Sequence, residues 1–199
     1  MRNVDHTHMR ELNIALILEY LRRDAPLSRT HLAQLTGLNK ATVTSLVREL
    51  LESDFVHESG TDVGDIGRPA IRLSLNPRAG YIIGAEIGVD FVLVILTDFS
   101  GDVVWRRRET TRPRERQEVV LDLLDAVLQD ACQYAHAQGM RLLGLGLGVP
   151  GLVDVTAGTL LFAPNLGWAD VPLKARLQRK FKMPIEVANE ANLAALGES

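Results

Sequence analysis

Two short segments, each preceded by a residue that can cap a helix, limit what the first third of this chain can form. Ser28 precedes a run that stops at Gly37, and Asn39 precedes a longer run that ends near Ser53. Ser and Asn are preferred helix N-caps, and glycine tolerates the left-handed conformation that ends many helices. In the second segment the apolar residues recur at helical spacing, at Val43, Leu46, Val47 and Leu50. The pattern predicts two helices joined by a tight turn.

The face of the second helix opposite these aliphatic side chains is polar. It carries Lys40, Thr42, Thr44, Ser45 and Arg48. Hydroxyl and cationic side chains of this kind can contact base edges and phosphates in the major groove of DNA. We therefore expect these five residues to contact DNA. A small helical hairpin with an ordinary solvated face is the alternative.

A loop and a strand follow this pair of helices. Residues 57–67 are rich in turn-forming residues, and residues 70–75 alternate between apolar and polar as a returning strand does. Arg68 stands between Gly67 and Pro69 at the foot of the loop. An arginine presented this way suits a narrow minor groove, where the negative potential is strongest. A DNA contact by Arg68 is expected, and a surface charge beside a turn is its alternative.

The remaining residues before position 81 complete this organisation. A helix from Arg10 to about Arg23 is expected to cover the helix pair through an apolar face formed by Leu12, Ala15, Leu16 and residues 18–20. Residues 77–80 are typical of a short joint between domains. The sequence thus predicts a winged helix-turn-helix DNA-binding domain over residues 1–76, a linker at 77–80 and a second domain at 81–199.

Charge and cysteine content bear on partners and location. The formal net charge is −3, and residues 1–78 contain ten Lys and Arg against ten Asp and Glu. A near-neutral DNA-binding domain implies modest non-specific affinity, which favours a homo-oligomer that binds two half-sites. The single cysteine, Cys132, excludes an internal disulfide and a cysteine-based zinc cluster within these residues. No apolar signal segment or membrane-length run is present, so the cytoplasm is the expected location.

The second domain has an α/β pattern. Three apolar runs with short connections, at residues 81–88, 91–97 and 103–109, predict an antiparallel meander. A long helix is expected from Glu115 to Gln138, with Val119, Leu123, Val127, Ala131 and Tyr134 on its apolar stripe. A strand at 141–149, a helix at 174–182, a strand at 185–188 and a helix from Asn189 are predicted to follow. The fold class is α/β behind an N-terminal all-α, winged-helix domain, and the second domain has the order β-β-β-α-β-α-β-α.

This order is that of the ribonuclease-H-like lobe found in actin-type and sugar-kinase-type proteins, and several segments resemble one family in particular. They are GLNKATVTSLVREL at 37–50, GRPAIRLSLNP at 67–77, GAEIGVDF at 84–91, GLGLGVPG at 144–151, APNLGW at 163–168 and ANEANLAALGE at 188–198. In these segments the chain resembles the ROK family, in the regulator branch that joins a winged helix to a sugar-kinase-like domain. The resemblance implies a transcriptional regulator, a repressor of carbohydrate genes, that binds an operator in double-stranded DNA and responds to a sugar or sugar derivative. ROK proteins normally continue into a second lobe of similar size.

The resemblance also implies a ligand site at Gly148, Asn165, Asn189 and Glu190. Asn165 matches a position at which sugar-binding ROK proteins hydrogen-bond a hexose hydroxyl, and its amide offers both a donor and an acceptor. Asn189 and Glu190 match an Asn-Asp pair of ROK kinases, whose aspartate is the general base. Gly148 shares one strand face with two other glycines, which indicates that another group approaches this face closely. A turn asparagine and a helix N-terminal acid are the alternatives for Asn165 and Glu190.

Two departures from the family pattern argue against a kinase. Glu190 is one methylene longer than aspartate, and a base misplaced by roughly an ångström can lose about a hundredfold in rate. The Asp-x-Gly-x-Thr hairpin of ROK kinases is replaced by residues 86–90, Glu-Ile-Gly-Val-Asp, whose second acid would repel a triphosphate. These departures lead us to expect no catalytic residue in this chain. We also expect no metal or other cofactor, because the family's zinc motif would lie beyond residue 199. A ROK sugar kinase that phosphorylates hexoses with ATP and carries an added DNA-binding domain is the alternative.

Other features favour ordinary structural roles. Residues 146–151 match the pattern G-x-G-x-x-G, but a dinucleotide site needs a helix directly after it, and residues 152–155 are typical of a strand. Trp168 and Cys132 are both expected to pack in the core.

Overall fold

A computed structural model describes residues 2–62 and 70–190 of the chain. These residues form two compact units that divide between Ala79 and Gly80, and the turn Phe99–Gly101 belongs to the first unit. Arg68 and most of the helix predicted from Asn189 onward lie outside the described residues. Within the described part of the chain, no helix combines the length and hydrophobicity that a bilayer crossing requires.

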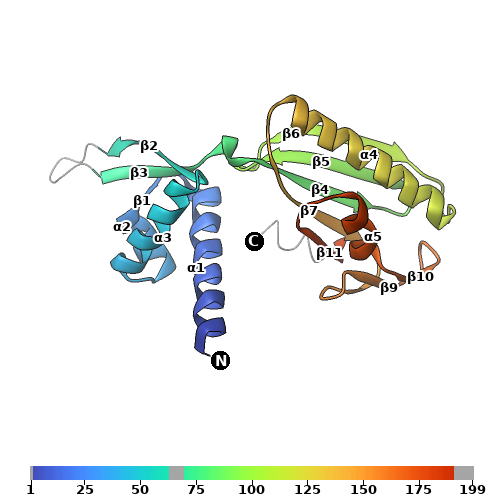
Figure 1. Cartoon of the computed structure of the whole chain (residues 1–199), viewed down its shortest axis with the longest axis horizontal. Helices are drawn as coiled ribbons and strands as arrows, with labels where there is room; N and C mark the ends of the chain where they lie inside the picture. The colour runs from blue at the N-terminus through green and yellow to red at the C-terminus, as the bar shows by residue number, and fades with distance from the viewer. Residues whose placement is uncertain (1, 63–69, 191–199) are drawn as a thin grey trace. The chain divides into compact units, whose positions relative to one another are not determined.

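The first unit is a winged helix-turn-helix (Figure 1). Its elements are α1 (Arg2–Asp24), β1 (Leu27–Ser28), α2 (Arg29–Thr36), α3 (Lys40–Glu52), β2 (Val56–Asp62), β3 (Ala70–Leu75) and the 3-10 turn η1 (Pro77–Ala79). β2 and β3 pair antiparallel, and β1 adds to the other edge of β3. The predicted helix pair and returning strand are confirmed, and η1 occupies the predicted linker.

One aliphatic core joins the helices of this unit to its small sheet. Its buried members include Ile17, Leu21, Leu32, Val43, Leu46, Val47, Leu50, Val56 and Leu73. Burying one such side chain stabilises a fold by about 1.5–3 kcal/mol, so packing of the apolar faces is what holds these short helices. The turn residue Phe99 adds an aromatic contact, with its ring centroid 4.9 Å from that of Phe55.

The prediction for α1 was wrong in its start and in part of its buried face. The helix begins at Arg2, and it packs inward through Ile17 and Leu21. Of the predicted inward residues, Leu12, Ala15 and Leu16 are exposed, whereas Leu18 and Tyr20 are partly buried against the core. α1 carries two apolar stripes on opposite faces, and periodicity alone does not say which of them meets the core. The structure selects the stripe with Ile17 and Leu21, both of which are members of the core that α2 and α3 share.

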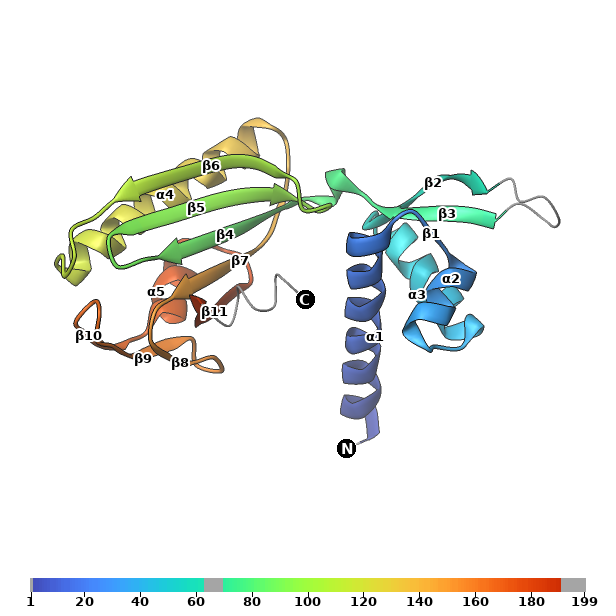
Figure 2. The same cartoon turned by 180° about the vertical axis from the view of Figure 1, so that it is seen from behind.

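The second unit is a five-stranded mixed sheet with two helices and a smaller sheet (Figures 1 and 2). Its elements are β4 (Tyr81–Ile87), β5 (Phe91–Asp98), β6 (Val103–Thr110), α4 (Gln117–Ala137), β7 (Leu142–Val149), β8 (Leu152–Asp154), β9 (Thr159–Ala163), β10 (Trp168–Val171), α5 (Leu173–Lys180) and β11 (Ile185–Asn189). The order in the large sheet is β11-β7-β4-β5-β6, with β4, β5 and β6 antiparallel and with β7 and β11 parallel to β4. The predicted order of strands and helices is confirmed as far as β11. The antiparallel sheet β10-β9-β8 is an addition to that order. Residues 152–155 were expected to be strand-like, as β8 is, whereas β9 and β10 were not predicted.

α4 packs against β4, β5 and β6 through a stripe that differs partly from the predicted one. Its buried residues are Val120, Leu121, Leu124, Asp125, Val127, Leu128, Ala131 and Ala135. Val127 and Ala131 were predicted correctly, whereas Val119 is 47% exposed. The observed stripe includes three leucines, so it removes more apolar surface from water than the predicted one.

Trp168 and Cys132 were both expected to pack in the core, and the structure buries the first and half-buries the second. Trp168 is buried within the main core of the second unit. Cys132 is half-buried against the same core, and burial raises the pKa of its thiol. A thiol whose pKa is raised holds less of the reactive thiolate at neutral pH, which fits a structural role.

Candidate functional site

Two capping side chains place α3 relative to α2. The Oγ atom of Ser28 accepts a hydrogen bond from the backbone N–H of His31 over 3.2 Å. The Oδ1 atom of Asn39 accepts one from the backbone N–H of Thr42 over 2.8 Å. Between these caps, Gly37 ends α2 in the left-handed conformation at φ 70°. All three predicted cap roles are confirmed, and together they define the tight turn of the helix-turn-helix.

The polar face of α3 is directed away from the core of its unit. Lys40, Thr44, Ser45 and Arg48 are exposed, and Thr42 is half-buried at the border of the face. The opposite face of the helix is buried through Val43, Leu46, Val47 and Leu50. The hydroxyl of Thr44 donates to the carbonyl oxygen of Lys40 over 2.7 Å, which leaves its oxygen free to accept. Four of the five predicted DNA-contact residues on α3 are therefore presented for contact, and Thr42 is presented in part.

Ala41 belongs to the same surface, although it was not among the predicted contacts. It is exposed and lies one turn before Thr44 and Ser45. An alanine methyl at such a position can contact the methyl group of thymine. Ala41 lies seven residues before Arg48, a spacing that places both on one face of the helix and could have indicated the contact. It was not predicted because alanine has no polar group.

The wing is described except for its tip. β2 and β3 pair from Val56 opposite Leu75 to Asp62 opposite Ala70, with an irregularity between Glu58 and Gly60. Arg68 falls in the segment outside the described residues, so its predicted DNA contact stays a prediction. Within the described wing, Arg72 donates a hydrogen bond to the carbonyl oxygen of Pro26 over 2.9 Å, which ties β3 to the segment before α2.

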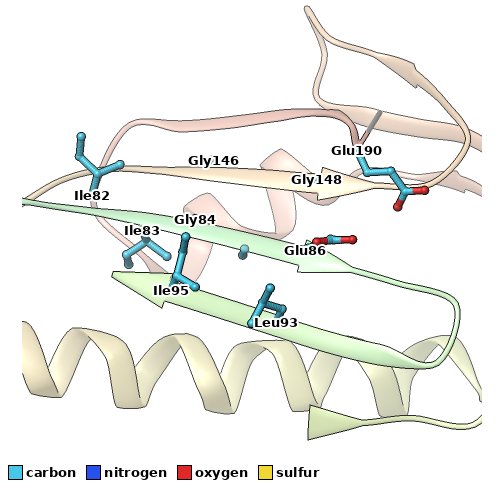
Figure 3. A pocket seen from close by; sticks show the side chains of 10 residues that line it. Ile82, Ile83, Gly84, Glu86, Leu93, Ile95, Gly146, Gly148 and Glu190 are labelled. Atoms are coloured by element: carbon cyan, nitrogen blue, oxygen red, sulfur yellow. The ribbon is translucent and has the colours of Figure 1, made fainter. Parts of the chain in front are cut away.

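In the second unit, a hollow lies on the face of the large sheet that is turned away from α4 (Figure 3). Along β4, Ile83, Ala85 and Ile87 point into the core, so the alternating residues lie on the hollow side. The hollow has a volume of about 670 Å³, and its lining residues are Ile82, Ile83, Gly84, Ala85, Glu86, Leu93, Ile95, Gly146, Gly148 and Glu190. It is mainly apolar, with carboxylates at one end.

Strand register explains why these residues meet. Glu86 lies opposite Leu93 of β5 on one side and opposite Gly148 of β7 on the other. In the next row, Gly84 lies between Ile95 and Gly146. A Cβ atom added at Gly146 would meet nothing within 4 Å, so among the described residues this part of the face is open. At Gly144 the carbonyl oxygen of Pro184 lies 3.4 Å from the position of an added Cβ atom, so a described segment approaches one end of the glycine face and leaves Gly146 open.

The carboxylates of Glu86 and Glu190 lie at the same end of the hollow (Figure 3). Burial raises the pKa of Glu190, and the negative charge of Glu86 raises it further. Both effects disfavour the ionised form of Glu190. A carboxyl group accepts hydrogen bonds from hydroxyl groups when ionised and can donate one when protonated, which suits a ligand rich in hydroxyl groups.

The other predicted ligand residues are not all gathered at this hollow. Gly148 and Glu190 line it, whereas Asn189 and Asn165 are not among its lining residues. The Nδ2 atom of Asn189 donates a hydrogen bond to the carbonyl oxygen of Gly151 over 2.7 Å. Asn165 is exposed in the turn between β9 and β10, two residues after Ala163. Glu86 lines the hollow but was not predicted as a ligand contact. The segment that contains it was interpreted only as the counterpart of the phosphate-binding hairpin of ROK kinases.

The described residues lack two features that metal and dinucleotide sites usually have. They contain no group of three or more His, Cys, Asp or Glu side chains that could hold a metal ion. The family zinc motif has no counterpart among them. β8 follows the glycine-rich residues 146–151 directly, so no helix begins straight after that turn, as the dinucleotide motif requires.

Comparison with protein families identifies both units. Residues 82–199 match the model described as ROK family, and residues 14–57 match the model described as winged helix-turn-helix DNA-binding. The first match covers more than half of the chain. It also confirms the resemblance on which the ligand-site predictions depend.

Relatives and solved structures agree with these matches. The xylose repressor of Caldicellulosiruptor bescii is 38% identical over 194 residues, which are 98% of this chain and 49% of that protein. The crystal structure of a ROK family transcriptional regulator, a homologue of the E. coli MLC protein, has a TM-score of 0.71 at 24% identity, over 92% of this chain and 46% of that one. A ROK family glucokinase from Streptomyces griseus in complex with glucose and AMPPNP has a TM-score of 0.51 at 31% identity, over 60% of this chain and 36% of that one. The chain spans about half the length of the curated repressors it matches. This chain belongs to the ROK family and carries a winged helix-turn-helix ahead of its ROK domain.

Proposed function

We propose that this protein is a sugar-responsive transcriptional repressor that works in the cytoplasm as a homo-oligomer. The observation that carries the proposal is the exposed polar face of α3, with Lys40, Thr44, Ser45 and Arg48 directed away from the core. A helix seated in this way by a tight turn and followed by a wing can enter the major groove. In this proposal Thr42 contacts the groove from the border of the face, and Arg68 contacts DNA from the wing.

The proposed effector site is the hollow on the large sheet. Glu190 and Gly148 supply a carboxylate and a close backbone approach for a sugar, while the apolar floor suits the C–H face of a pyranose. Asn189 supports the site by holding the turn at Gly151. Asn165 is proposed as a further contact, reached from the β9–β10 turn. Similarity to a xylose repressor makes xylose the first sugar to test.

We further propose that the protein is not an enzyme and holds no cofactor. The alternative is a sugar kinase, because the family also includes glucokinases. Glu86 and Glu190 place two carboxylates at the same end of the hollow, and Asp90 is exposed in the hairpin that follows β4. Three acids in this region oppose a triphosphate. A coupled assay for ATP turnover with xylose, glucose and N-acetylglucosamine tests the point, and phosphorylation above background would contradict it.

DNA binding is tested with genomic fragments selected by the purified chain, with and without these sugars. Replacement of Arg48 by glutamine is expected to weaken binding to the selected fragment about tenfold or more. Arg179→Gln is the matched control, because Arg179 is exposed on α5 and lies outside the winged helix. Equal losses for the two variants would indicate a general charge effect and would remove the support for α3 as the reading helix.

A further inference from the structure

A second hollow, which we call the α4 hollow, lies between the start of α4 and the segment that joins β9 to β10. It has a volume of about 620 Å³, and its lining includes Arg114, Arg116 and Gln117 on one side and Phe162 and Trp168 on the other. It shares no lining residue with the hollow on the large sheet. A ligand bound here would therefore be separate from the proposed effector.

The indole N–H of Trp168 is a donor in this hollow. Trp168 is only 3% exposed, and no acceptor in the described part of the chain bonds to its side chain. Its nitrogen is not one of the fully enclosed polar atoms without a partner, which among the described residues are Oδ1 of Asp125 and Nε of Arg176. The small accessible part of Trp168 thus includes the nitrogen, where the side chain lines the α4 hollow. Because a buried tryptophan N–H usually has a hydrogen-bond partner, this one points to a ligand that accepts.

The N-terminus of α4 offers further donors to the same hollow. Its N-cap, Arg116, makes no side-chain capping hydrogen bond, whereas Ser28 caps α2 and Asn39 caps α3. Within residues 2–62 and 70–190, the backbone N–H of Gln117 has no acceptor. α4 is 21 residues long, and the dipole of a helix favours an anion at this end. The donors of the hollow therefore favour an oxyanion.

The side chains around the hollow limit the charge of that anion. The lining contains the guanidinium groups of Arg114 and Arg116 and the carboxylate of Glu115. The Oε1 atom of Glu115 accepts from the backbone N–H of Arg116 over 3.2 Å. Glu118 is not a lining residue, and its carboxylate lies 3.8 Å from a guanidinium nitrogen of Arg176. Two cations against one acid suit a monoanion, since a second negative charge on the ligand would meet the repulsion of Glu115.

The opposite wall of the hollow is apolar. Phe162 is 55% exposed, and Pro164 and Leu166 also line this side. Such a wall suits the apolar body of a ligand whose charged end reaches the start of α4.

We propose that the α4 hollow binds a small organic acid, a carboxylate carried on an aromatic or alicyclic ring. The carboxylate oxygens accept hydrogen bonds from the indole of Trp168 and from the N-terminus of α4. Arg114 and Arg116 add charge-assisted hydrogen bonds, and the ring covers Phe162. The inference goes beyond the proposed repressor function and does not depend on it.

The test follows the indole N–H signal of Trp168 by nuclear magnetic resonance in the isotope-labelled full chain. Trp105 is the other tryptophan, so a Trp105→Phe variant assigns the signal. Cyclohexanecarboxylate is expected to shift this signal saturably and to bind about tenfold or more tightly than the uncharged cyclohexanecarboxamide. Equal binding of the two compounds, or no saturable shift, would overturn the proposal. So would inorganic phosphate that binds as tightly as the carboxylate, because phosphate has no apolar body.

Variants of the full chain test which residues hold the ligand. Arg114→Gln and Arg116→Gln together should weaken carboxylate binding about tenfold or more. Arg112→Gln is the matched control, because Arg112 is exposed in the same segment but does not line the hollow. All three arginines are exposed, so the melting temperature should not change. Equal losses for the control would show a general charge effect and would overturn the assignment.

A competition experiment separates this site from the proposed effector site. Xylose should leave the affinity for cyclohexanecarboxylate and the position of the Trp168 signal unchanged. Displacement of the carboxylate by xylose would place both compounds in one site and would overturn a separate acid site. Carboxylate binding by a protein that binds no DNA and no sugar would leave the acid site in place and remove the repressor proposal.

Discussion

Asn189 donates a hydrogen bond from Nδ2 to the carbonyl oxygen of Gly151 over 2.7 Å, across 38 positions of sequence. The bond joins the end of β11 to the turn between β7 and β8, immediately beside Glu190. Gly151 has φ 113°, a conformation that favours glycine. The side chain of Asn189 thereby holds the turn next to the proposed effector site, which gives it a positioning role there.

Replacement of Asn189 by alanine should destabilise the chain by about 1–3 kcal/mol, because it leaves a partly buried carbonyl oxygen without its donor. Asn189→Asp should be at least as damaging, since a carboxylate cannot donate to that oxygen. Thermal melting measures the loss, and calorimetric titration with xylose measures any weakening of sugar binding. Asn165→Ala, in an exposed turn, is the control for stability and should melt like the parent protein. Unchanged melting of Asn189→Ala would contradict the positioning role.

Gly146 and Gly151 form a matched pair for a second prediction. A Cβ atom at Gly151 would overlap the carbonyl oxygen of Phe162, whereas one at Gly146 would meet nothing within 4 Å. Gly151→Ala should therefore destabilise by about 2 kcal/mol or more from backbone strain alone. Gly146→Ala should keep the melting temperature but weaken sugar binding, because its methyl group enters the hollow. A Gly146→Ala protein with the parent's sugar affinity would show that the ligand does not approach this strand.

The sequence predicted well what depends on local chemistry. The caps at Ser28, Gly37 and Asn39 and the buried face of α3 follow from short-range side-chain and backbone interactions, so a pattern of a few residues suffices. The order of the strands of the large sheet followed for the same reason, with family resemblance naming the topology. These elements position the proposed DNA-reading face.

Features that depend on contacts between distant parts of the chain could not be predicted from local patterns. α1 has two apolar stripes, and only the position of α2 and α3 decides that Ile17 goes inward and Leu12 outward. Glu86 reaches Gly148 through strand register, which no linear pattern expresses. The ion pairs of Asp125 likewise join residues more than 50 positions apart.

Asp125 is the subject of a third prediction. It is 4% exposed on α4, and its Oδ2 atom accepts from Arg176 over 2.8 Å and from Lys180 of α5 over 2.5 Å. Asp125→Ala removes the buried acceptor that Arg176 and Lys180 share, so it should destabilise by about 1–3 kcal/mol. Asp122 contacts the same Arg176 but is 72% exposed, and Asp122→Ala should change stability by less than about 1 kcal/mol. Chemical denaturation of both variants gives the comparison, and similar losses would show that burial does not govern this network.

The pKa shift of Glu190 gives a pH-dependent prediction. Burial and the charge of Glu86 raise the pKa of Glu190 above its ordinary value of 4.5, so the folded chain holds this proton more tightly than the unfolded chain does. At pH below 4.5 both states are protonated and the group has little effect on stability. As the pH rises through the folded pKa, the ionised carboxyl destabilises the folded state. Glu86→Gln removes the repelling charge, so its melting temperature should fall less than that of the parent protein between pH 4 and pH 7. Glu190→Gln removes the titrating group, and in that background Glu86→Gln should no longer alter this part of the pH profile. An undiminished effect of Glu86→Gln in the Glu190→Gln background would show that the two carboxylates are not coupled.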